Sequence, residues 1–495
     1  MLQEHIQQDS VLTFKKITVM KSFKNILVIG LFTVGLSTFY SCNKLDLKPS
    51  DTIDPEKAYR NLEDIDMAIK GAYAGMTYTL IGNSVVVSDE AIYPSENTVG
   101  NVSAYRWQYT ASSSSVTSAF GEYYVVIDRA NRALAGLEKL EKVDADKRKH
   151  YQGELLAIRA FAHVELLRAY AAGYEPTALG IPYMLKSEIG HPPRKTVAEV
   201  ISLAQKDIND ALGLIGDEEA VYRFSKTGLY ALQARTALYA RDWTLAIAAS
   251  SKVIAEKPLA DRSSFPKIWS DESSNEVVFS LRRTAADLPK DDDSPAEGPL
   301  GAMFFRQDGE IALYTPSNKL LALFDKNKDI RFSSYVLNDP NRGAGKQQYL
   351  IGKYLGRKDD DATAGLVDVK LFRTGEMYLI RAEANAETNK LNEANNDLNV
   401  LRKARIQDYQ NQVIASKDEL IDAILVERYK ELAFEGHRFF DLKRRKMPVR
   451  RGAQDAVNTA GALLLESTKA QYNFPIPADE IFVNKNMVQN PGYTK

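Results

Sequence analysis

The chain has 495 residues, 44% hydrophobic and 26% charged, a composition typical of a globular protein with ample apolar material for a large core. Its formal net charge of -1 argues against a nucleic-acid binder, which needs a basic face to neutralise phosphates. One cysteine excludes an internal disulfide, and five histidines leave few ligands for a zinc or iron centre, so we expect no cofactor and no metal.

The N-terminal part reads as an export signal. Residues 20–42, MKSFKNILVIGLFTVGLSTFYSC, combine two lysines, an apolar stretch and a small residue before the only cysteine, Cys42. The apolar stretch is shorter than the ~20 residues that a membrane-spanning helix needs. Cys42 resembles the lipidated cysteine of a bacterial lipoprotein, and we expect it to carry a lipid that anchors the chain to a membrane.

These features divide the chain into four expected segments. We expect residues 1–19 to be an upstream extension before a start at Met20, and residues 20–41 to be a lipoprotein signal peptide. Residues 42–55 then form a polar lipidated tether, and residues 56–495 form one large binding domain. A first helix is expected within residues 55–76.

Helical periodicity dominates the large domain. Residues 153–171 place their apolar side chains on one face. Residues 226–256 and 375–405 each predict a pair of helices, with breaks near Arg241 and near Asn389. Such Ala-rich pairs are similar to tetratricopeptide repeats, in which small residues let two helices pack closely. We therefore predict a mostly α fold built on tetratricopeptide-like helix pairs, with long irregular loops and minor β structure.

Irregular stretches separate the predicted helices. Residues 77–120 are rich in Ser, Asn and Tyr, while residues 283–300 and 357–368 are charged and contain turn residues. The segment EVVFSLRR, residues 276–283, predicts a short strand. Loops of this length in a compact protein are usually functional or disordered.

The aromatic residues of the first irregular stretch are the candidate ligand-binding residues. Trp107 lies in the polar segment YRWQY, away from any helical stripe. An aromatic ring there is either packed beneath a loop or exposed as a platform on which a sugar ring stacks. The candidate set for the second alternative is Trp107, Tyr105, Tyr109 and Tyr93.

Catalytic and metal-binding motifs are absent from the sequence. There is no phosphate-binding G-x-x-x-x-G-K-[ST], no C-x-x-C and no H-E-x-x-H. Residues 325–336 begin like a calcium loop with Asp325, Asn327 and Asp329. However, Ile330 stands where such a loop needs glycine, and Val336 where a bidentate glutamate closes the site, so we do not expect calcium there.

The segment ERYKELAFEGHRFFDLKRR, residues 427–445, looks reactive. On a helix its three glutamates would share one face, and basic residues surround them. Carboxylates beside guanidiniums have lowered pKa values, which suits ion pairing and not general-acid catalysis. We therefore favour a structural charge network over a hydrolase that would use Glu435 and His437. The residues assigned to the network are Glu427, Arg428, Glu431, Glu435, Gly436, His437, Arg438 and Asp441.

The same segment resembles the hallmark of the SusD/RagB family, outer-membrane nutrient-binding lipoproteins of the Bacteroidota. The C-terminal YNFPIPADEIFVNKNMVQNPGY, residues 472–493, resembles that family's ending, and residues 123–134, 153–170 and 373–384 are similar to further family segments. The resemblance implies a SusD-like fold, a non-enzymatic role and a SusC-like TonB-dependent barrel as partner. It transfers no ligand-contacting residue, because the family's variable loops form the ligand surface.

We therefore expect a cell-surface lipoprotein of the outer membrane that captures a glycan and delivers it to the transporter. An alternative is a helical-repeat adaptor that binds protein or peptide ligands through a flat apolar groove.

Overall fold

The computed structural model describes residues 58–99, 102–217, 221–287, 298–306, 311–357 and 364–493. The expected extension, signal peptide and tether, with Cys42, lie outside the described residues. A compact unit begins at Tyr59 and contains the helices and strands of the described chain. None of its described helices is long and apolar enough to cross a membrane.

Helices make up most of the regular structure, which confirms the predicted mostly α class. The α-helices are α2 (Leu62–Ala74), α3 (Thr79–Val87), α4 (Val102–Tyr105), α5 (Ser114–Lys139), α6 (Ala145–Tyr170), α7 (Val197–Leu214), α8 (Lys226–Ala240), α9 (Trp243–Glu256), α10 (Asn318–Leu321), α11 (Ile330–Tyr335), α12 (Thr374–Glu387), α13 (Leu391–Arg405), α14 (Lys417–Glu431), α15 (Arg438–Arg444) and α16 (Ala478–Val483). The 3-10 helices are η1 (Pro266–Ile268), η2 (Ala285–Asp287), η3 (Leu300–Met303), η5 (Ala453–Asp455) and η6 (Ala470–Tyr472).

The strands are short and pair two by two in antiparallel fashion. They are β1 (Ala91–Ile92) with β5 (Thr315–Pro316), β2 (Val277–Leu281) with β8 (Val369–Arg373), β3 (Phe305–Arg306) with β4 (Ile311–Ala312), β6 (Val336–Asn338) with β7 (Tyr349–Ile351), and β9 (Val449–Arg450) with β10 (Leu464–Leu465). β2 is the strand that the sequence predicts within residues 276–283.

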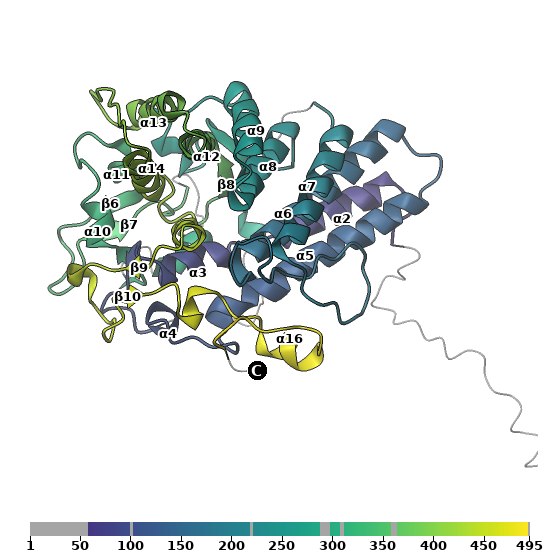
Figure 1. The fold of residues 1–495 in the computed structure, drawn as a ribbon, viewed down its shortest axis with the longest axis horizontal. Helices are drawn as coiled ribbons and strands as arrows, with labels where there is room; N and C mark the ends of the chain where they lie inside the picture. Colours follow the sequence, from purple (N-terminus) through teal and green to yellow (C-terminus); the bar gives the residue numbers. More distant parts are fainter. Residues whose placement is uncertain are drawn as a thin grey trace, which may run out of the picture. The chain divides into compact units, whose positions relative to one another are not determined.

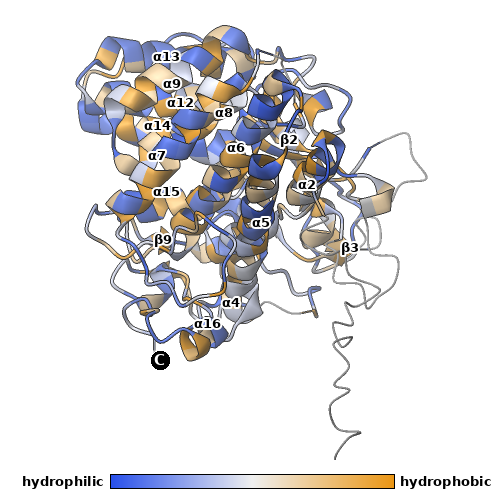
Figure 2. Cartoon of the chain, turned by 90° about the vertical axis from the view of Figure 1, so that its right-hand side faces the viewer, coloured by the Kyte–Doolittle hydropathy of each residue, from blue (hydrophilic) through white to orange (hydrophobic). Residues whose placement is uncertain are grey.

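The long helices pack in chain order. α6 packs against α5 and α7, α7 against α8, α8 against α9, and α9 against α12, which also contacts α13 and α14 (Figure 1). Both predicted breaks are present: Arg241 adopts a left-handed backbone after α8, and Asn389 does so after α12. Hydrophobic and hydrophilic residues are interleaved along these helices (Figure 2). α5 and α7 bury one face, whereas α8 and the second half of α6 are buried on nearly every side.

The prediction of a long irregular stretch after the first helix is wrong. Residues 77–120, expected to be irregular, contain α3, α4 and the start of α5. α3 has the sequence TLIGNSVVV, whose β-branched residues, glycine and asparagine have low helix propensity and show no amphipathic period. It is helical because it is buried on nearly every side, so tertiary packing outweighs local preference.

The segment of residues 427–445 forms the end of α14, a turn and α15. Its network residues are buried, apart from the partly exposed Arg438. The prediction that Glu435 continues the helix face of Glu431 is wrong, because α14 ends at Glu431. Gly436 then takes a left-handed backbone, and a Cβ there would lie 2.9 Å from the Cα of Ile81 on α3, so only glycine allows this close approach.

Glu431 is at the centre of a buried ion-pair network. Its carboxylate lies 3.1 Å from Arg331, 3.1 Å from Arg373 and 3.0 Å from Arg405, and all four side chains are essentially inaccessible. Burial alone would raise the pKa of Glu431, but the three guanidiniums outweigh burial and lower it. The carboxylate is therefore ionised in the folded protein.

The remaining residues of the segment extend the network outward. Glu435 pairs with Lys353 at 2.7 Å and with Arg373 at 2.6 Å. Glu427 pairs with the guanidinium of Arg331 at 2.7 Å, and Arg428 donates to Asp441 at 3.0 Å. Arg438 donates to both carboxylate oxygens of Asp89, at 2.7 and 3.0 Å.

We expect Glu431→Gln to lower the free energy of unfolding by about 3–5 kcal/mol at neutral pH, because three buried guanidiniums lose their shared counter-charge. The lowered pKa gives stability that is complete above the unfolded-state value of 4.5 and is lost as the pH falls through the folded-state pKa. The deficit of the variant should therefore shrink in acid. Denaturant unfolding at pH 7 and pH 3 measures it.

Glu419→Gln, on the exposed first turn of the same helix, is the matched control and should unfold like the wild type. Equal stability of Glu431→Gln and Glu419→Gln at pH 7 would contradict the network's structural role.

Candidate functional site

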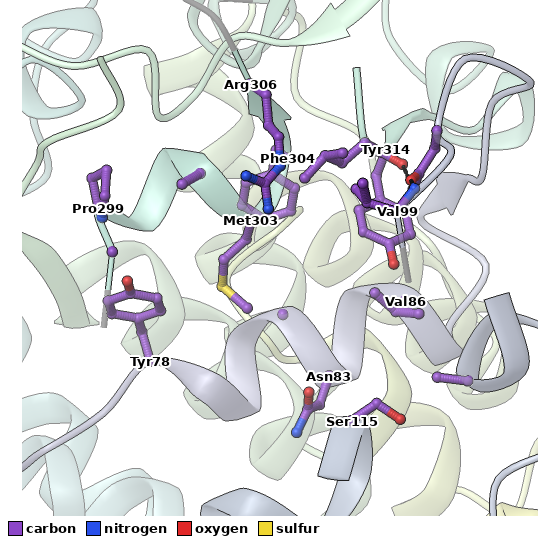
Figure 3. A pocket seen from close by; sticks show the side chains of 16 residues that line it. Tyr78, Asn83, Val86, Val99, Ser115, Pro299, Met303, Phe304, Arg306 and Tyr314 are labelled. Carbon is purple, nitrogen blue, oxygen red and sulfur yellow. Dashed lines mark hydrogen bonds between the residues drawn. The ribbon is translucent and has the colours of Figure 1, made fainter. Parts of the chain in front are cut away.

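A cavity of about 520 Å³ lies over α3, within the size range of small-ligand sites. It is bounded by α3, the loop before α4, the start of α5, η3, β3 and the segment before β5 (Figure 3). The lining residues are Tyr78, Gly82, Asn83, Val86, Asn97, Val99, Ala104, Ser115, Gly298, Pro299, Ala302, Met303, Phe304, Arg306, Leu313 and Tyr314.

Gly82 shapes the floor of this cavity. Met303 reaches from η3 toward α3, where a Cβ at position 82 would come within 1.7 Å of its Cε (Figure 3). The missing side chain therefore creates the space that the thioether occupies. Because methionine is unbranched and adaptable, Met303 can change rotamer to suit a bound molecule.

Three aromatic residues, Tyr78, Phe304 and Tyr314, line the cavity together with polar side chains. Asn97 is held by its own hydrogen bonds: its amide donates to the Leu313 carbonyl at 2.7 Å, and its side-chain oxygen accepts from the Val99 amide at 3.0 Å. These bonds tie the loop before α4 to the segment before β5.

The Asn83 amide nitrogen lies buried in this lining without a hydrogen-bond partner among the described residues. An unsatisfied buried donor costs about 1–3 kcal/mol. Arg306 is the charged residue among the described lining residues. Apolar rings, amides, hydroxyls and one guanidinium suit the binding of a polar, largely uncharged molecule by stacking and hydrogen bonds.

The candidate residues around Trp107 lie elsewhere. Trp107 is 8% exposed, its indole nitrogen donates to the Val87 carbonyl at 2.9 Å, and the guanidinium of Arg451 lies 4.1 Å from its ring centroid. The same guanidinium lies 3.9 Å from the ring of Tyr105. Ring faces that are already covered by protein have no room for a sugar.

The other two rings are buried as well. Tyr109 is inaccessible and donates its hydroxyl to the Gln471 carbonyl, while Tyr93 is 5% exposed and packs against Tyr105 with 5.7 Å between ring centroids. The cluster thus joins α3 and α4 to the C-terminal part of the chain. The expectation of an exposed stacking platform is corrected here: of the two alternatives for Trp107, packing beneath neighbouring segments is the one observed.

The two residues of the hydrolase alternative are buried, Glu435 in ion pairs and His437 as a neutral imidazole. Burial would raise the pKa of Glu435, but Arg373 and Lys353 outweigh it and lower the pKa. Burial, reinforced by surrounding guanidiniums, depresses the pKa of His437, which is therefore neutral. An ionised carboxylate saturated by cations is unsuited to general-acid catalysis.

The calcium-like segment is also occupied by ion pairs. Asp329 caps α11 and pairs with Arg331 at 2.8 Å and with Lys430 at 2.9 Å. No group of three or more His, Cys, Asp or Glu side chains in the described part of the chain is placed to hold a metal ion.

Comparison with known proteins agrees with this architecture. Residues 326–493 match the model of the SusD family, and residues 45–238 match the model described as "Starch-binding associating with outer membrane". The chain belongs to the SusD/RagB family. Its members bind carbohydrate and are not catalysts, so the expected non-enzymatic role fits the family.

Individual relatives cover either most of the chain or one part of it. The SusD-like protein P38 of Formosa agariphila is 25% identical over 86% of this chain and 92% of its own. The starch-binding protein SusD of Bacteroides thetaiotaomicron is 36% identical over 28% of this chain and 24% of its own. A solved SusD superfamily protein from Bacteroides vulgatus has a TM-score of 0.76 at 24% identity, covering 88% of this chain and all of its own.

Sequence reasoning missed the cavity residues. Tyr78, Asn83 and Met303 carry no motif, and Tyr314 lies in a short segment without a clear period. The one available signal was Gly82 within an apolar run, since an isolated glycine often marks a close approach.

We expect Trp107→Ala to destabilise the fold by about 3–5 kcal/mol, because it opens a cavity in a packed interior and removes the hydrogen bond to Val87. Thermal unfolding measures the loss. Trp243→Ala, at the half-buried start of α9, is the control and should cost less. An unchanged melting temperature for Trp107→Ala would show that the ring is not packed as described.

Proposed function

We propose that the protein is a lipid-anchored glycan-binding protein of the outer membrane that holds an oligosaccharide in the cavity over α3. It passes the bound glycan to a SusC-like TonB-dependent transporter and makes or breaks no bond itself. Cys42 carries the lipid, and the binding domain faces the cell exterior.

Family membership supports the ligand class and the compartment. One matching model is described as starch-binding and as associating with the outer membrane, and one relative is named a starch-binding protein. A binding protein above a channel raises the local solute concentration and selects the solute by shape before transport.

The single observation that carries the proposal is the cavity over α3, lined by three aromatic rings together with polar side chains, within the described part of the chain. Sugars present flat C–H faces to aromatic rings and many hydroxyl oxygens to donors, so this lining is complementary to them. The protein-binding adaptor is not favoured, because the lining residues enclose a concave space and do not form a flat groove.

Filling the cavity should abolish binding without unfolding the protein. Ala302 is half-buried on η3 and faces the cavity, so Ala302→Trp places an indole where the ligand would lie. We expect affinity for the best-bound member of a panel of neutral oligosaccharides, including maltooligosaccharides, to fall at least ~10-fold, which equals ~1.4 kcal/mol. Isothermal titration calorimetry measures it, and the melting temperature should stay near that of the wild type.

The matched control is Ala286→Trp, an exposed alanine on another 3-10 helix, η2, that does not line the cavity. It should bind like the wild type. If Ala302→Trp also binds like the wild type, the ligand site lies elsewhere on the protein.

Cys42→Ala should release the protein from the membrane, because the lipid is the proposed attachment. Cell fractionation with a high-salt wash should find the wild type with outer membranes and the variant in the soluble fraction.

Gentle detergent extraction of the wild type should co-purify a large β-barrel. Isolation of the wild type without a barrel at native expression would contradict the transporter partner. Retention of the Cys42 variant in washed membranes would contradict the lipid anchor.

A further inference from the structure

A second cavity, of about 260 Å³, lies among basic side chains at the end of α6. It is formed by the segment after α6, the turn between α8 and α9, the end of α15 and the loop around η6. It shares no lining residue with the cavity over α3. Its charged lining residues are Glu175, Arg241, Lys443, Arg444 and Lys446.

Two of these cations have carboxylate partners. Arg444 donates to Asp441 at 2.8 Å and pairs with Glu383, and Lys446 lies 2.5 Å from Glu175. Glu175 is the acidic residue among the described lining residues. Because it pairs with Lys446, the other cations have no counter-charge from the lining itself.

Lys443 and Arg241 bond only to backbone oxygens within the described chain. The Lys443 ammonium donates to the Ala171 carbonyl at 2.8 Å and to the Ala169 carbonyl at 3.5 Å, and Arg241 donates to the Arg444 carbonyl at 3.3 Å. Neither has a carboxylate oxygen within 4 Å among the described residues. Carbonyl dipoles satisfy hydrogen bonds but do not neutralise a charge.

Lys443 is only 4% exposed, and its ammonium lies 4.9 Å from the ring centroid of Tyr174. A buried ammonium without a carboxylate is costly to keep charged. Burial, together with the like charge of Arg194, lowers the pKa of Lys443 to about 7, and Glu175 offsets this only in part. An anion in the cavity would supply the missing counter-charge.

We propose that this cavity binds an oxyanion, a carboxylate, sulfate or phosphate group, held by Lys443 and Arg241. The hydroxyls of Tyr472 and Tyr174 are occupied by backbone carbonyls, so the two cations provide the specific attraction. The oxyanion is either a free inorganic ion or an acidic group on a saccharide. The site does not depend on glycan binding over α3.

The experiment titrates the full-length protein in detergent at pH 6 with sodium sulfate, glucuronate and glucose by isothermal titration calorimetry. Sulfate and glucuronate should bind and glucose should not bind at this site. Tighter binding of glucuronate than of sulfate identifies a site for an acidic sugar, and the reverse a site for the free ion. Absence of binding by both anions overturns the proposal.

Lys443→Met should weaken anion binding at least ~10-fold, because it keeps much of the side chain's length and removes its charge. Replacement of an uncompensated buried charge by an apolar residue should leave the melting temperature unchanged or raised. Lys206→Met, which removes an exposed lysine on α7 paired with Asp210, is the matched control and should bind like the wild type.

If the Lys443 variant fails to fold, Arg241→Met tests the same site from its exposed side and should also weaken binding. Unchanged affinity in the folded variants overturns the proposal.

Binding should also weaken as the pH rises from 6 to 8, because Lys443 loses its charge near pH 7. The other charged groups that face it are Arg194, Glu175, Arg444 and Arg241. Burial lowers the pKa of Arg194 only to about 10, and Glu383 and Asp441 outweigh burial to raise the pKa of Arg444. Lys446 lowers the pKa of Glu175, so these three groups keep their charge between pH 6 and pH 8. Lys443→Met should bind weakly at every pH. A wild-type affinity that is independent of pH would contradict the role of Lys443.

Discussion

The burial of Glu431 among three arginines is the constraint on which the rest of the structure depends. Arg331, Arg373 and Arg405 come from α11, β8 and α13, so one carboxylate fixes three separate segments against the end of α14. A buried charge without its partner is strongly unfavourable, and the arrangement is therefore stable only when every segment is in place. Such a network favours one packing of the segments over its competitors.

The network also positions the cavity over α3. Just beyond Glu431, the backbone amide of Phe434 donates to Glu90 and Arg438 binds Asp89, while Tyr429, just before Glu431, donates to the Asp89 carbonyl. These acceptors directly follow α3. Gly436 packs against Ile81 on the same helix, next to Gly82 in the cavity floor. The segment that looks reactive in sequence thus supports the floor of the proposed binding site and does not line it.

The sequence predicted the features that local residue patterns determine. The breaks at Arg241 and Asn389 interrupt strong helical periods, and β2 stands out by its run of β-branched and aromatic residues. α3 escaped prediction because its helical state comes from burial on nearly all sides. The SusD/RagB resemblance identified the fold from its motifs, which belong to the scaffold, while the cavity residues carry no motif.

Trp107 shows the same limit of sequence reasoning. Its neighbours in sequence are polar, which favoured an exposed ring. However, the Arg451 guanidinium that covers the ring comes from a segment more than three hundred residues later.

The ion-pair network around Glu431 and the second cavity differ in how their buried charges are balanced. Around Glu431 and Glu435, carboxylates and cations alternate, and their pKa values are held where both partners are ionised. At Lys443 the same degree of burial occurs without a carboxylate within 4 Å among the described residues. An uncompensated buried charge lowers stability, so its presence beside a cavity indicates a binding role for that cavity. The network's charges are satisfied within the protein, whereas the charge of Lys443 is complementary to an anion from outside it.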